Sequence, residues 1–270
     1  MNIHTFIFIF QLSFLTICIN LNMAIRIDLN CDMGEGYQTD QLIMPFISSA
    51  NIACGYHAGD NETIKETIQL AQQYGVAIGA HPSYQDRAGF GRRAMEMNND
   101  ELHKIIVEQI NLVKTIADSL GQQLKHVKPH GALYNASASK YSIASIIAAA
   151  IKSIDPSLKL FGMPNTASER AANNEGIAFC REVFCDRSYT DEGMLTPRAA
   201  SNALINGSDQ ALLQVLQVIK ENTVTSTSGK KISMKVDTLC IHGDGLHALE
   251  FVKTISAGLE KENIIIAACT

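Results

Sequence analysis

The sequence of 270 residues contains no tryptophan, and aromatic residues make up only 6% of it. So few aromatic side chains leave little surface on which nucleic-acid bases or sugar rings could stack. Basic residues are also in the minority, since 22 Lys and Arg stand against 27 Asp and Glu and give a net charge of −5. A nucleic-acid-binding protein normally presents a basic patch to the phosphates. We therefore expect no nucleic-acid partner.

Several short catalytic and nucleotide-binding motifs are absent as well. The sequence has no G-x-G-x-x-G fingerprint for dinucleotides, no P-loop G-x-x-x-x-G-K-[ST] for ATP and no G-x-S-x-G nucleophile elbow. Its seven cysteines include no C-x-x-C pair. An odd number of cysteines without such pairs is typical of a reducing compartment rather than of a disulfide framework. We therefore expect free thiols and a cytoplasmic location.

The first 22 residues differ from the rest of the chain. Residues 6–19 are mostly apolar, but no Lys or Arg precedes them and no A-x-A site follows, although a signal peptide would have both. The run is also shorter than the roughly 20 residues that cross a membrane. We interpret residues 1–22 as an extension from an upstream start codon, with an export signal as the alternative. We expect a single domain over residues 23–270 and no membrane partner.

Apolar, β-branched runs alternate with helical patterns along the remaining sequence. The runs occupy residues 25–30, 49–54, 76–80, 125–128, 158–162, 178–184 and 237–242, and a last run spans 263–268. A helical period of about 3.6 residues marks residues 61–74, 101–120, 141–154, 209–221 and 246–260. Strands that alternate with helices predict right-handed βαβ units and a parallel sheet.

Polar groups follow nearly every predicted strand. The strand ends read "NCDMGEG", "GYHAGD", "AHPSYQDR", "KPHGALY", "REVFCDR" and "HGDG". A Rossmann-type sheet would instead carry one glycine fingerprint after its first strand. Only a closed ring brings so many strand ends to one mouth, and barrel active sites form at the carboxyl ends of the strands. The sequence therefore predicts an α/β fold, a (β/α) barrel of seven or eight strands.

The loops at this mouth contain the residue types of acid–base and hydrolytic chemistry. Imidazole acts as a base or metal ligand near neutral pH, carboxylates activate water, and Lys or Arg holds an oxyanion or a carboxylate. Because no serine elbow or His-paired cysteine is evident, we expect water to attack an amide or ester. The candidates are His57, His81, His130, His242, Asp28, Asp32, Glu35, Asp60, Asp86, Glu182, Asp186, Asp244, Lys128, Arg87, Arg92 and Arg187.

Some of these residues have a structural explanation too. Asp60 precedes a predicted helix and suits an N-cap as well as a binding residue. Asp28 lies within the first strand, so its side chain faces either the barrel interior or a partner. Gly243 and Gly245 precede another predicted helix and could bind an anion at its N-terminus.

Several blocks are long enough to point to a family. "IDLNCDMGEG", "SANIACGYHAGD", "GVAIGAHPSYQDRAGFGRR", "HVKPHGALYN", "REVFCDR" with "LTPR", and "CIHGDG" together resemble the LamB/YcsF family from residue 24 to the C-terminus. The resemblance implies a seven-stranded barrel of the glycoside hydrolase/deacetylase type, with residues 263–268 as a small closing strand. It also implies an ATP-hydrolysing 5-oxoprolinase that acts with two partner subunits, B and C. The reaction is 5-oxo-L-proline + ATP + 2 H₂O → L-glutamate + ADP + phosphate.

The implied reaction suggests a role for each candidate. His57, His81 and His130 serve as acid or base, Asp32 and Glu35 orient water or a histidine, and Lys128 meets a phosphate or oxyanion. His242 with Gly243 and Gly245 holds phosphate. Arg92 or Arg187 binds the substrate carboxylate. The predicted catalytic residues are Asp32, Glu35, His57, His81, Lys128 and His130, and the predicted substrate-binding residues are Asp28, Arg92, Asp186, Arg187, His242, Gly243, Asp244 and Gly245. ATP with Mg²⁺ is the expected co-substrate, and a resident metal at the mouth stays an open question.

Two other functions remain open at this stage. A barrel with histidines and aspartates at its mouth could bind a divalent metal and act alone as an amidohydrolase or polysaccharide deacetylase. Alternatively, the chain could be a non-catalytic subunit that binds a small acid or holds its partners together. A stoichiometric metal ion and activity without ATP would indicate the first function. Unchanged activity of the complex after replacement of His130 or Asp32 with Ala would indicate the second.

Overall fold

The computed structural model describes residues 24–243 and 248–269. The predicted extension, residues 1–22, lies outside them. Seven parallel strands form a closed ring in the order β1-β2-β3-β4-β5-β6-β9, in which β9 pairs with both β6 and β1. The ring strands are β1 (Arg26–Met33), β2 (Ser49–Ala53), β3 (Ala77–His81), β4 (Leu124–Val127), β5 (Lys159–Gly162), β6 (Phe179–Phe184) and β9 (Thr238–Ile241). The (β/α) barrel and its seven strands are therefore confirmed.

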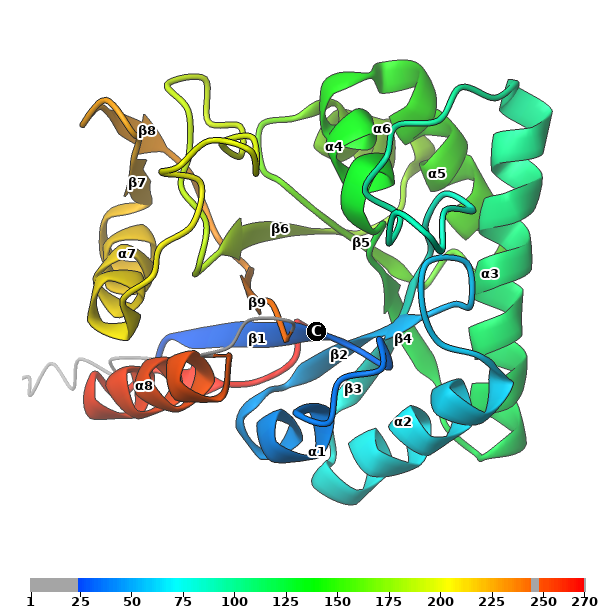
Figure 1. The fold of residues 1–270 in the computed structure, drawn as a ribbon, viewed down its shortest axis with the longest axis horizontal. Helices are drawn as coiled ribbons and strands as arrows, with labels where there is room; N and C mark the ends of the chain where they lie inside the picture. Colours follow the sequence, from blue (N-terminus) through cyan, green and yellow to red (C-terminus); the bar gives the residue numbers. More distant parts are fainter. Residues whose placement is uncertain (1–23, 244–247, 270) are drawn as a thin grey trace, which may run out of the picture.

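Helices cover the outside of the ring, and Figure 1 shows α3 and α5 on one side of the barrel and α7 and α8 on the other. The helices are α1 (Asp40–Ile43), the 3₁₀ turn η1 (Met44–Phe46), α2 (Asn61–Tyr74), α3 (Asn99–Ser119), α4 (Gly131–Ser139), α5 (Tyr141–Ile154), α6 (Ala167–Glu175), α7 (Ser208–Glu221) and α8 (Ala248–Lys261). The sequence predicts α2, α3, α5, α7 and α8 closely. It misses the short helices α1, α4 and α6 and the hairpin of β7 (Thr223–Thr225) with β8 (Lys231–Ser233).

Capping residues and apolar stripes explain where the long helices begin and pack. The side chain of Asp60 accepts a hydrogen bond from the Thr63 amide at 2.9 Å, so Asp60 is the N-cap of α2. Gly75 ends that helix in the left-handed conformation. The stripe that α3 buries against the barrel has helical spacing and consists of Leu102, Ile105, Ile106, Gln109, Ile110, Val113 and Ala117. Among the described residues, no helix combines the length and apolarity needed to cross a membrane.

The barrel interior is polar. Alternate residues of a strand point to the same face, so Asp28, Asn30 and Asp32 of β1 all face inward. They meet inward-facing polar groups from the other strands in hydrogen bonds that cross the ring. All of these side chains are buried. The inward-facing set is Asp28, Asn30, Asp32, Ser49, Asn51, His126, Lys128, Glu182, Thr238 and Cys240.

The C-terminal segment crosses the amino-terminal end of the barrel. The short strand β10 (Ile265–Ile266) pairs only with the first residues of β1, which confirms the predicted closing strand. The segment then reaches β5 and β6, where Lys159 donates a hydrogen bond to the Cys269 carbonyl at 2.8 Å. Cys269 forms a disulfide with Cys180.

The expectation of free thiols is therefore wrong for this pair. The two cysteines are 89 residues apart in the sequence, and only the path of the C-terminal segment brings them together. Cys31, Cys54, Cys185 and Cys240 are free and buried, as packing residues would be.

Candidate functional site

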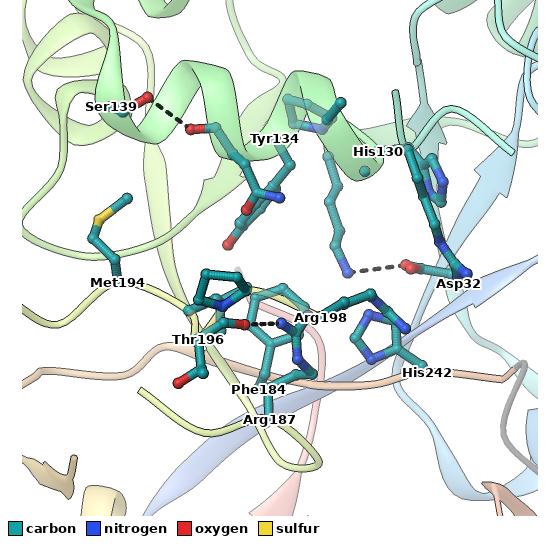
Figure 2. A pocket seen from close by; sticks show the side chains of 18 of the residues that line it. Asp32, His130, Tyr134, Ser139, Phe184, Arg187, Met194, Thr196, Arg198 and His242 are labelled. Atoms are coloured by element: carbon teal, nitrogen blue, oxygen red, sulfur yellow. Dashed lines mark hydrogen bonds and ion pairs between the residues drawn. The ribbon is translucent and has the colours of Figure 1, made fainter. Parts of the chain in front are cut away.

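The carboxyl ends of the strands surround one pocket of about 530 Å³. Seven of the sixteen predicted polar residues line it, and it also contains residues from α4 and from the segment between β6 and α7. Figure 2 shows Asp32 and His130 on one side, Tyr134 of α4 above, and Arg198 and His242 directed into the same space. The predicted residues that line it are Asp32, His81, Arg92, Lys128, His130, Arg187 and His242.

Asp32 lies at the base of this pocket, at the end of β1. Its Oδ1 accepts hydrogen bonds from Lys128 Nζ and from Asn51 Nδ2, both at 2.9 Å. Its Oδ2 lies 3.3 Å from His81 Nε2. Burial alone would raise the pKa of Asp32, but the charges of His81 and Lys128 outweigh it and hold the pKa well below its usual range. Asp32 is therefore an ionised acceptor at neutral pH.

Three histidines and a glutamate gather beside Asp32. His81 Nε2 and His130 Nδ1 are 2.9 Å apart, and Glu35 Oε1 lies 3.2 Å from His57 Nε2 and 3.6 Å from His130 Nδ1. The rings of His57 and His130 stack with their centroids 3.9 Å apart. These four residues, Glu35, His57, His81 and His130, are called the histidine cluster below.

The loop after β3 packs directly against this cluster. Gly91 adopts a positive φ of 65°, and a Cβ there would lie 2.9 Å from a ring carbon of His130 and 3.0 Å from the Cβ of His57. Only glycine allows this approach without displacing the two rings. The adjacent Phe90 carbonyl accepts a hydrogen bond from His130 Nε2 at 2.9 Å.

Burial keeps two of the cluster's imidazoles neutral. It lowers the pKa of His57 to about 4 and lowers that of His130 well below its usual range, with further lowering by the charge of His81. A neutral imidazole has one nitrogen lone pair that can accept a proton or bind a metal. Both residues therefore suit the acid–base role predicted for them and the role of ligand.

Lys128 is more enclosed than a phosphate-binding lysine would be. Its ammonium lies 2.9 Å from Glu182 Oε1 as well as from Asp32, and it also contacts Asn30 and Cys240. Burial alone would lower the pKa of Lys128, but Asp32 and the other partners raise it well above its usual value. An ammonium has three protons to donate, so its geometry favours holding Asp32 over binding a phosphate.

The opposite wall of the pocket carries positive charge. Arg187 is buried and donates hydrogen bonds to the carbonyls of Thr196 and Ala203 at 2.6 and 3.2 Å. Burial, together with the charge of Arg198, lowers the pKa of Arg187. Two neighbouring guanidinium groups at one wall favour an anionic ligand there. His242 also faces the pocket, and its Nδ1 contacts Asp186 Oδ2 at 2.8 Å.

Some predicted residues do not reach the pocket. The carboxylate of Asp28 accepts hydrogen bonds from the hydroxyls of Ser48, Ser49 and Thr238, near the amino-terminal end of the barrel. Its position therefore does not support the substrate-binding role predicted for it. Its place two residues before Asn30 puts it deeper in the barrel. Gly243 is buried against the backbone of Asp32 and does not line the pocket.

Asp244 and Gly245 lie outside the described residues, so their predicted roles stay predictions. The exposed Asp60 serves as a helix cap. Glu35 and His57 belong to the histidine cluster and lie behind the pocket wall.

Sequence reasoning missed several residues of the site. Asn30 and Asn51 connect the carboxylates inside the ring, and Tyr134 and Arg198 line the pocket. A period of two along β1 would have indicated Asn30, since it lies between two inward-facing aspartates. Arg198 is part of the "LTPR" block, but it does not follow the end of a predicted strand, so the strand-end pattern did not indicate it.

Within residues 24–243 and 248–269, two groups of side chains place potential metal-binding atoms within 4.8 Å of one another. One is the histidine cluster, and the other combines Asp32, Cys240 and His242. The second group already contains the Lys128 ammonium, which contacts both Asp32 and Cys240 and would repel a cation. The histidine cluster is therefore the better candidate.

Comparison with known proteins places this chain in a family. The LamB/YcsF family matches residues 27–270. The chain is 45% identical over 246 residues to the A subunit of 5-oxoprolinase from Staphylococcus aureus strain MSSA476, and the match covers 89% of this chain and 98% of that protein. The corresponding protein of strain MW2 matches to the same extent.

A solved structure agrees with these relatives. The lactam utilization protein from Thermus thermophilus superimposes with a TM-score of 0.86 at 36% identity, over 90% of this chain and 100% of that one. The resemblance inferred from the sequence blocks is thereby confirmed. The barrel, the strand-end motifs and these relatives together show that the chain belongs to the LamB/YcsF family.

Proposed function

We propose that this chain is the A subunit of an ATP-hydrolysing 5-oxoprolinase and that the lactam opens in the pocket above Asp32. The names of the relatives support the substrate, since they are 5-oxoprolinase subunits and a lactam utilization protein. The observation that carries the proposal is the placement of Asp32. One ionised carboxylate, held by Lys128 and lying beside His81, forms the base of a pocket with a cationic wall.

The chemistry explains why such a pocket would be coupled to ATP. 5-Oxoproline is a five-membered lactam whose amide is stabilised by resonance, so water alone opens it poorly. Transfer of the γ-phosphoryl group of ATP to the lactam oxygen gives ADP and makes the ring carbon electrophilic. One water then adds to that carbon and the C–N bond breaks, and a second water releases phosphate from the acyl phosphate. The products are glutamate, ADP and phosphate.

Asp32 orients the attacking water in this proposal. Its Oδ1 is occupied by Lys128 and Asn51, so Oδ2, on the His81 side, is the oxygen available to accept a hydrogen bond from water. Because this acceptor already holds the water in the direction of attack, less orientational entropy is lost on reaching the transition state. The neutral His130, which lines the pocket beside His81, accepts and returns the proton.

The cationic wall binds the substrate carboxylate. Arg187 already donates two hydrogen bonds to backbone carbonyls, which fix the plane of its guanidinium. Arg198 lines the same wall on the exposed side, and Arg92 approaches from the loop after β3. A guanidinium binds a carboxylate through paired hydrogen bonds, which gives both affinity and orientation. His242, held by Asp186, is placed to contact the phosphoryl group.

ATP with Mg²⁺ and the B and C subunits complete the proposal. The sequence has no P-loop, so the partner subunits supply part or all of the nucleotide site. Coupling to ATP requires an ATP pool and supports a cytoplasmic location.

Reconstitution of the complex tests this function. The chain is assayed alone and with the B and C subunits, with and without ATP, and release of glutamate and phosphate from 5-oxoproline is measured. We expect glutamate only when ATP and both partners are present, with one phosphate per glutamate. Hydrolysis of the lactam or of an acetyl amide by the chain alone, without ATP, would instead identify a stand-alone metal-dependent hydrolase.

A further inference from the structure

Breaking the C–N bond of a lactam requires a proton at the departing nitrogen, because an amine anion is a very poor leaving group. A general acid positioned at that nitrogen supplies the proton. In the proposed function, His130 receives the proton of the attacking water. Its Nδ1 faces His81 at 2.9 Å, so a proton received there stays on the Asp32 side of the pocket. A second group that lines the pocket must hold the proton for the nitrogen.

Most of the other proton-bearing groups of the pocket are already committed. The ammonium of Lys128 directs its three protons at acceptors inside the barrel. The two nitrogens of His81 face the Lys128 carbonyl and His130. Burial raises the pKa of Tyr134 well above its usual value, so its hydroxyl retains its proton. Guanidinium groups do not release a proton either. Of the titratable residues that line the pocket in the described part of the chain, His242 remains.

The contacts of His242 fix the orientation of its ring. Its Nδ1 lies 3.0 and 2.8 Å from the two carboxylate oxygens of Asp186. Burial alone would raise the pKa of Asp186, but the charge of His242 and its hydrogen bond outweigh burial and lower it. An ionised carboxylate only accepts hydrogen bonds, so Nδ1 carries a hydrogen and donates it. The ring of Phe184 packs nearly parallel to the imidazole, with centroids 5.3 Å apart.

This orientation leaves the Nε2 atom of His242 for the ligand. Within residues 24–243 and 248–269, every hydrogen bond of the His242 side chain is made by Nδ1 to Asp186. The imidazole lines the pocket and is directed into it in Figure 2, and 13% of the side chain stays exposed. A ring nitrogen of His242 lies within 4.8 Å of a carboxylate oxygen of Asp32. The entering oxygen and the departing nitrogen are bonded to one carbon, so two groups this close can serve both.

The charges around His242 suit a proton donor. Asp186 lies on one side of the imidazole and the ionised Asp32 on the other. With the phosphorylated lactam bound, the phosphoryl anion joins these two carboxylates, and opposite charges favour the imidazolium form. The nearby Lys128 is compensated by its own two carboxylates. The guanidinium groups of the cationic wall face the substrate carboxylate in the proposed function.

We propose that His242 is the catalytic acid that protonates the departing lactam nitrogen, and that Asp186 is the positioning residue that orients it. This inference rests on the proposed function and assigns the proton transfer within it. The contact of His242 with the phosphoryl group uses the same Nε2–H, because the phosphoryl oxygen and the nitrogen share one carbon. Asp186 holds the tautomer and stabilises the imidazolium, as a carboxylate does for the histidine of a catalytic triad.

The protons of this step balance. Water adds to the ring carbon of the phosphorylated lactam, and one of its protons passes to His130. Nε2 of His242 gives its proton to the nitrogen, and the C–N bond breaks with its electron pair on the nitrogen. The hydroxyl on the carbon then becomes the carbonyl of the acyl phosphate, and its proton restores the imidazolium of His242. The free amine takes up the proton that His130 releases.

Loss of the acid should change which group leaves the carbon. Without a proton, the nitrogen departs poorly, and the phosphate is expelled from the same tetrahedral carbon instead. That outcome consumes ATP and regenerates 5-oxoproline, whose carbonyl oxygen now comes from water. A residue that only binds the phosphoryl group would instead lower ATP use and glutamate release together.

The ratio of the two products tests this role in the complex with the B and C subunits. Glutamate and phosphate release from 5-oxoproline and ATP are measured in H₂¹⁸O, and recovered 5-oxoproline is analysed for ¹⁸O by mass spectrometry. The variants are His242→Gln and Asp186→Asn. His103→Gln is the control, because His103 lies on α3 and does not line the pocket. Circular dichroism and size-exclusion chromatography verify fold and assembly.

We expect His242→Gln to lower glutamate release by about 100- to 10,000-fold, the usual contribution of a general acid. Phosphate release should fall much less, so the ratio of phosphate to glutamate should rise at least about 10-fold, with ¹⁸O in the recovered 5-oxoproline. Asp186→Asn should shift the ratio in the same direction, and it decides the question if His242→Gln does not assemble. The control should keep the ratio of the wild type.

An assembled His242→Gln complex with the wild-type ratio and no ¹⁸O in 5-oxoproline would overturn this role, whether its rates fall together or stay unchanged. The failure of the proposed function has a different signature. In that case the wild-type complex itself releases no glutamate from 5-oxoproline and ATP, and the role of His242 falls with it.

Discussion

The Nζ atom of Lys128 lies 2.9 Å from Oδ1 of Asp32, and both side chains are almost completely removed from solvent, with exposed fractions of 2% and 6%. The same ammonium lies 2.9 Å from Glu182 Oε1. A buried charge is tolerated only when it is paired, so this lysine compensates two carboxylates at once. The pair thereby links the stability of the barrel to the geometry of the pocket.

Replacing Lys128 with methionine should destabilise the fold. The variant Lys128→Met keeps the approximate volume but leaves Asp32 and Glu182 buried without their cation. Loss of one partner of a buried ion pair costs roughly 3–5 kcal/mol. Urea unfolding measures this cost, with Lys125→Met as the control, since Lys125 lies on β4 but is exposed. Equal destabilisation by both substitutions would contradict this explanation.

Arg198 should contribute to substrate affinity. In the reconstituted complex, Arg198→Gln should raise the KM for 5-oxoproline by about 10- to 100-fold, since a hydrogen bond to a charged group contributes roughly 1.5–3 kcal/mol. The kcat should change little. Arg170→Gln is the matched control, because Arg170 packs over Tyr141 outside the pocket. An unchanged KM in Arg198→Gln would remove this residue from the substrate site.

Asp40 should make stability depend on pH. Burial raises the pKa of Asp40 to about 6, although a hydrogen bond from the Gly34 amide opposes the shift. Because the folded pKa lies above the unfolded one, the folded state binds more protons. The stability from protonated Asp40 is complete below about pH 4 and is lost as the pH rises through about 6.

The variant Asp40→Asn isolates this contribution. The free energy of unfolding of the wild type, minus that of the variant, should be largest near pH 4 and should decrease up to about pH 6. Denaturant unfolding at a series of pH values measures the difference. A difference that stays constant over this range would refute the assignment.

The Cys180–Cys269 disulfide should stabilise the barrel by fixing the C-terminal segment. In non-reducing buffer, Cys269→Ser should lower the free energy of unfolding by roughly 2–4 kcal/mol, chiefly because the cross-link restricts the unfolded chain. A reductant should abolish the difference between the two proteins. Mass spectrometry of a non-reduced digest detects the linked peptides, and two separate peptides would show that the bond does not form.

Much of the fold could be predicted from the sequence because its signals are local. The boundaries of α2 follow from the cap at Asp60 and from Gly75, and each strand of the ring is an apolar run with a polar end. The helices α4 and α6 escaped prediction because they have only nine residues each. The disulfide escaped because its geometry depends on how the last segment crosses the barrel.

The site could be predicted only in part. His81, Lys128 and His130 follow strand ends, and barrel geometry brings strand ends together. Which partner each side chain contacts depends on the register of the ring, and the sequence does not reveal it. Lys128 therefore looked like a phosphate ligand, although it is enclosed by Asp32 and Glu182. Asp28 looked similar to Asp32, although its position near the start of β1 places it at the other end of the barrel.

The most direct test of the account is the activity of the complex assembled with Asp32→Asn. The substitution preserves the shape of the side chain and removes the charge that orients water. We expect glutamate release to fall by at least about 100-fold, the cost of a misplaced reacting group, while assembly with the B and C subunits is unchanged. Full activity in the assembled variant would contradict the account and identify the chain as a non-catalytic subunit.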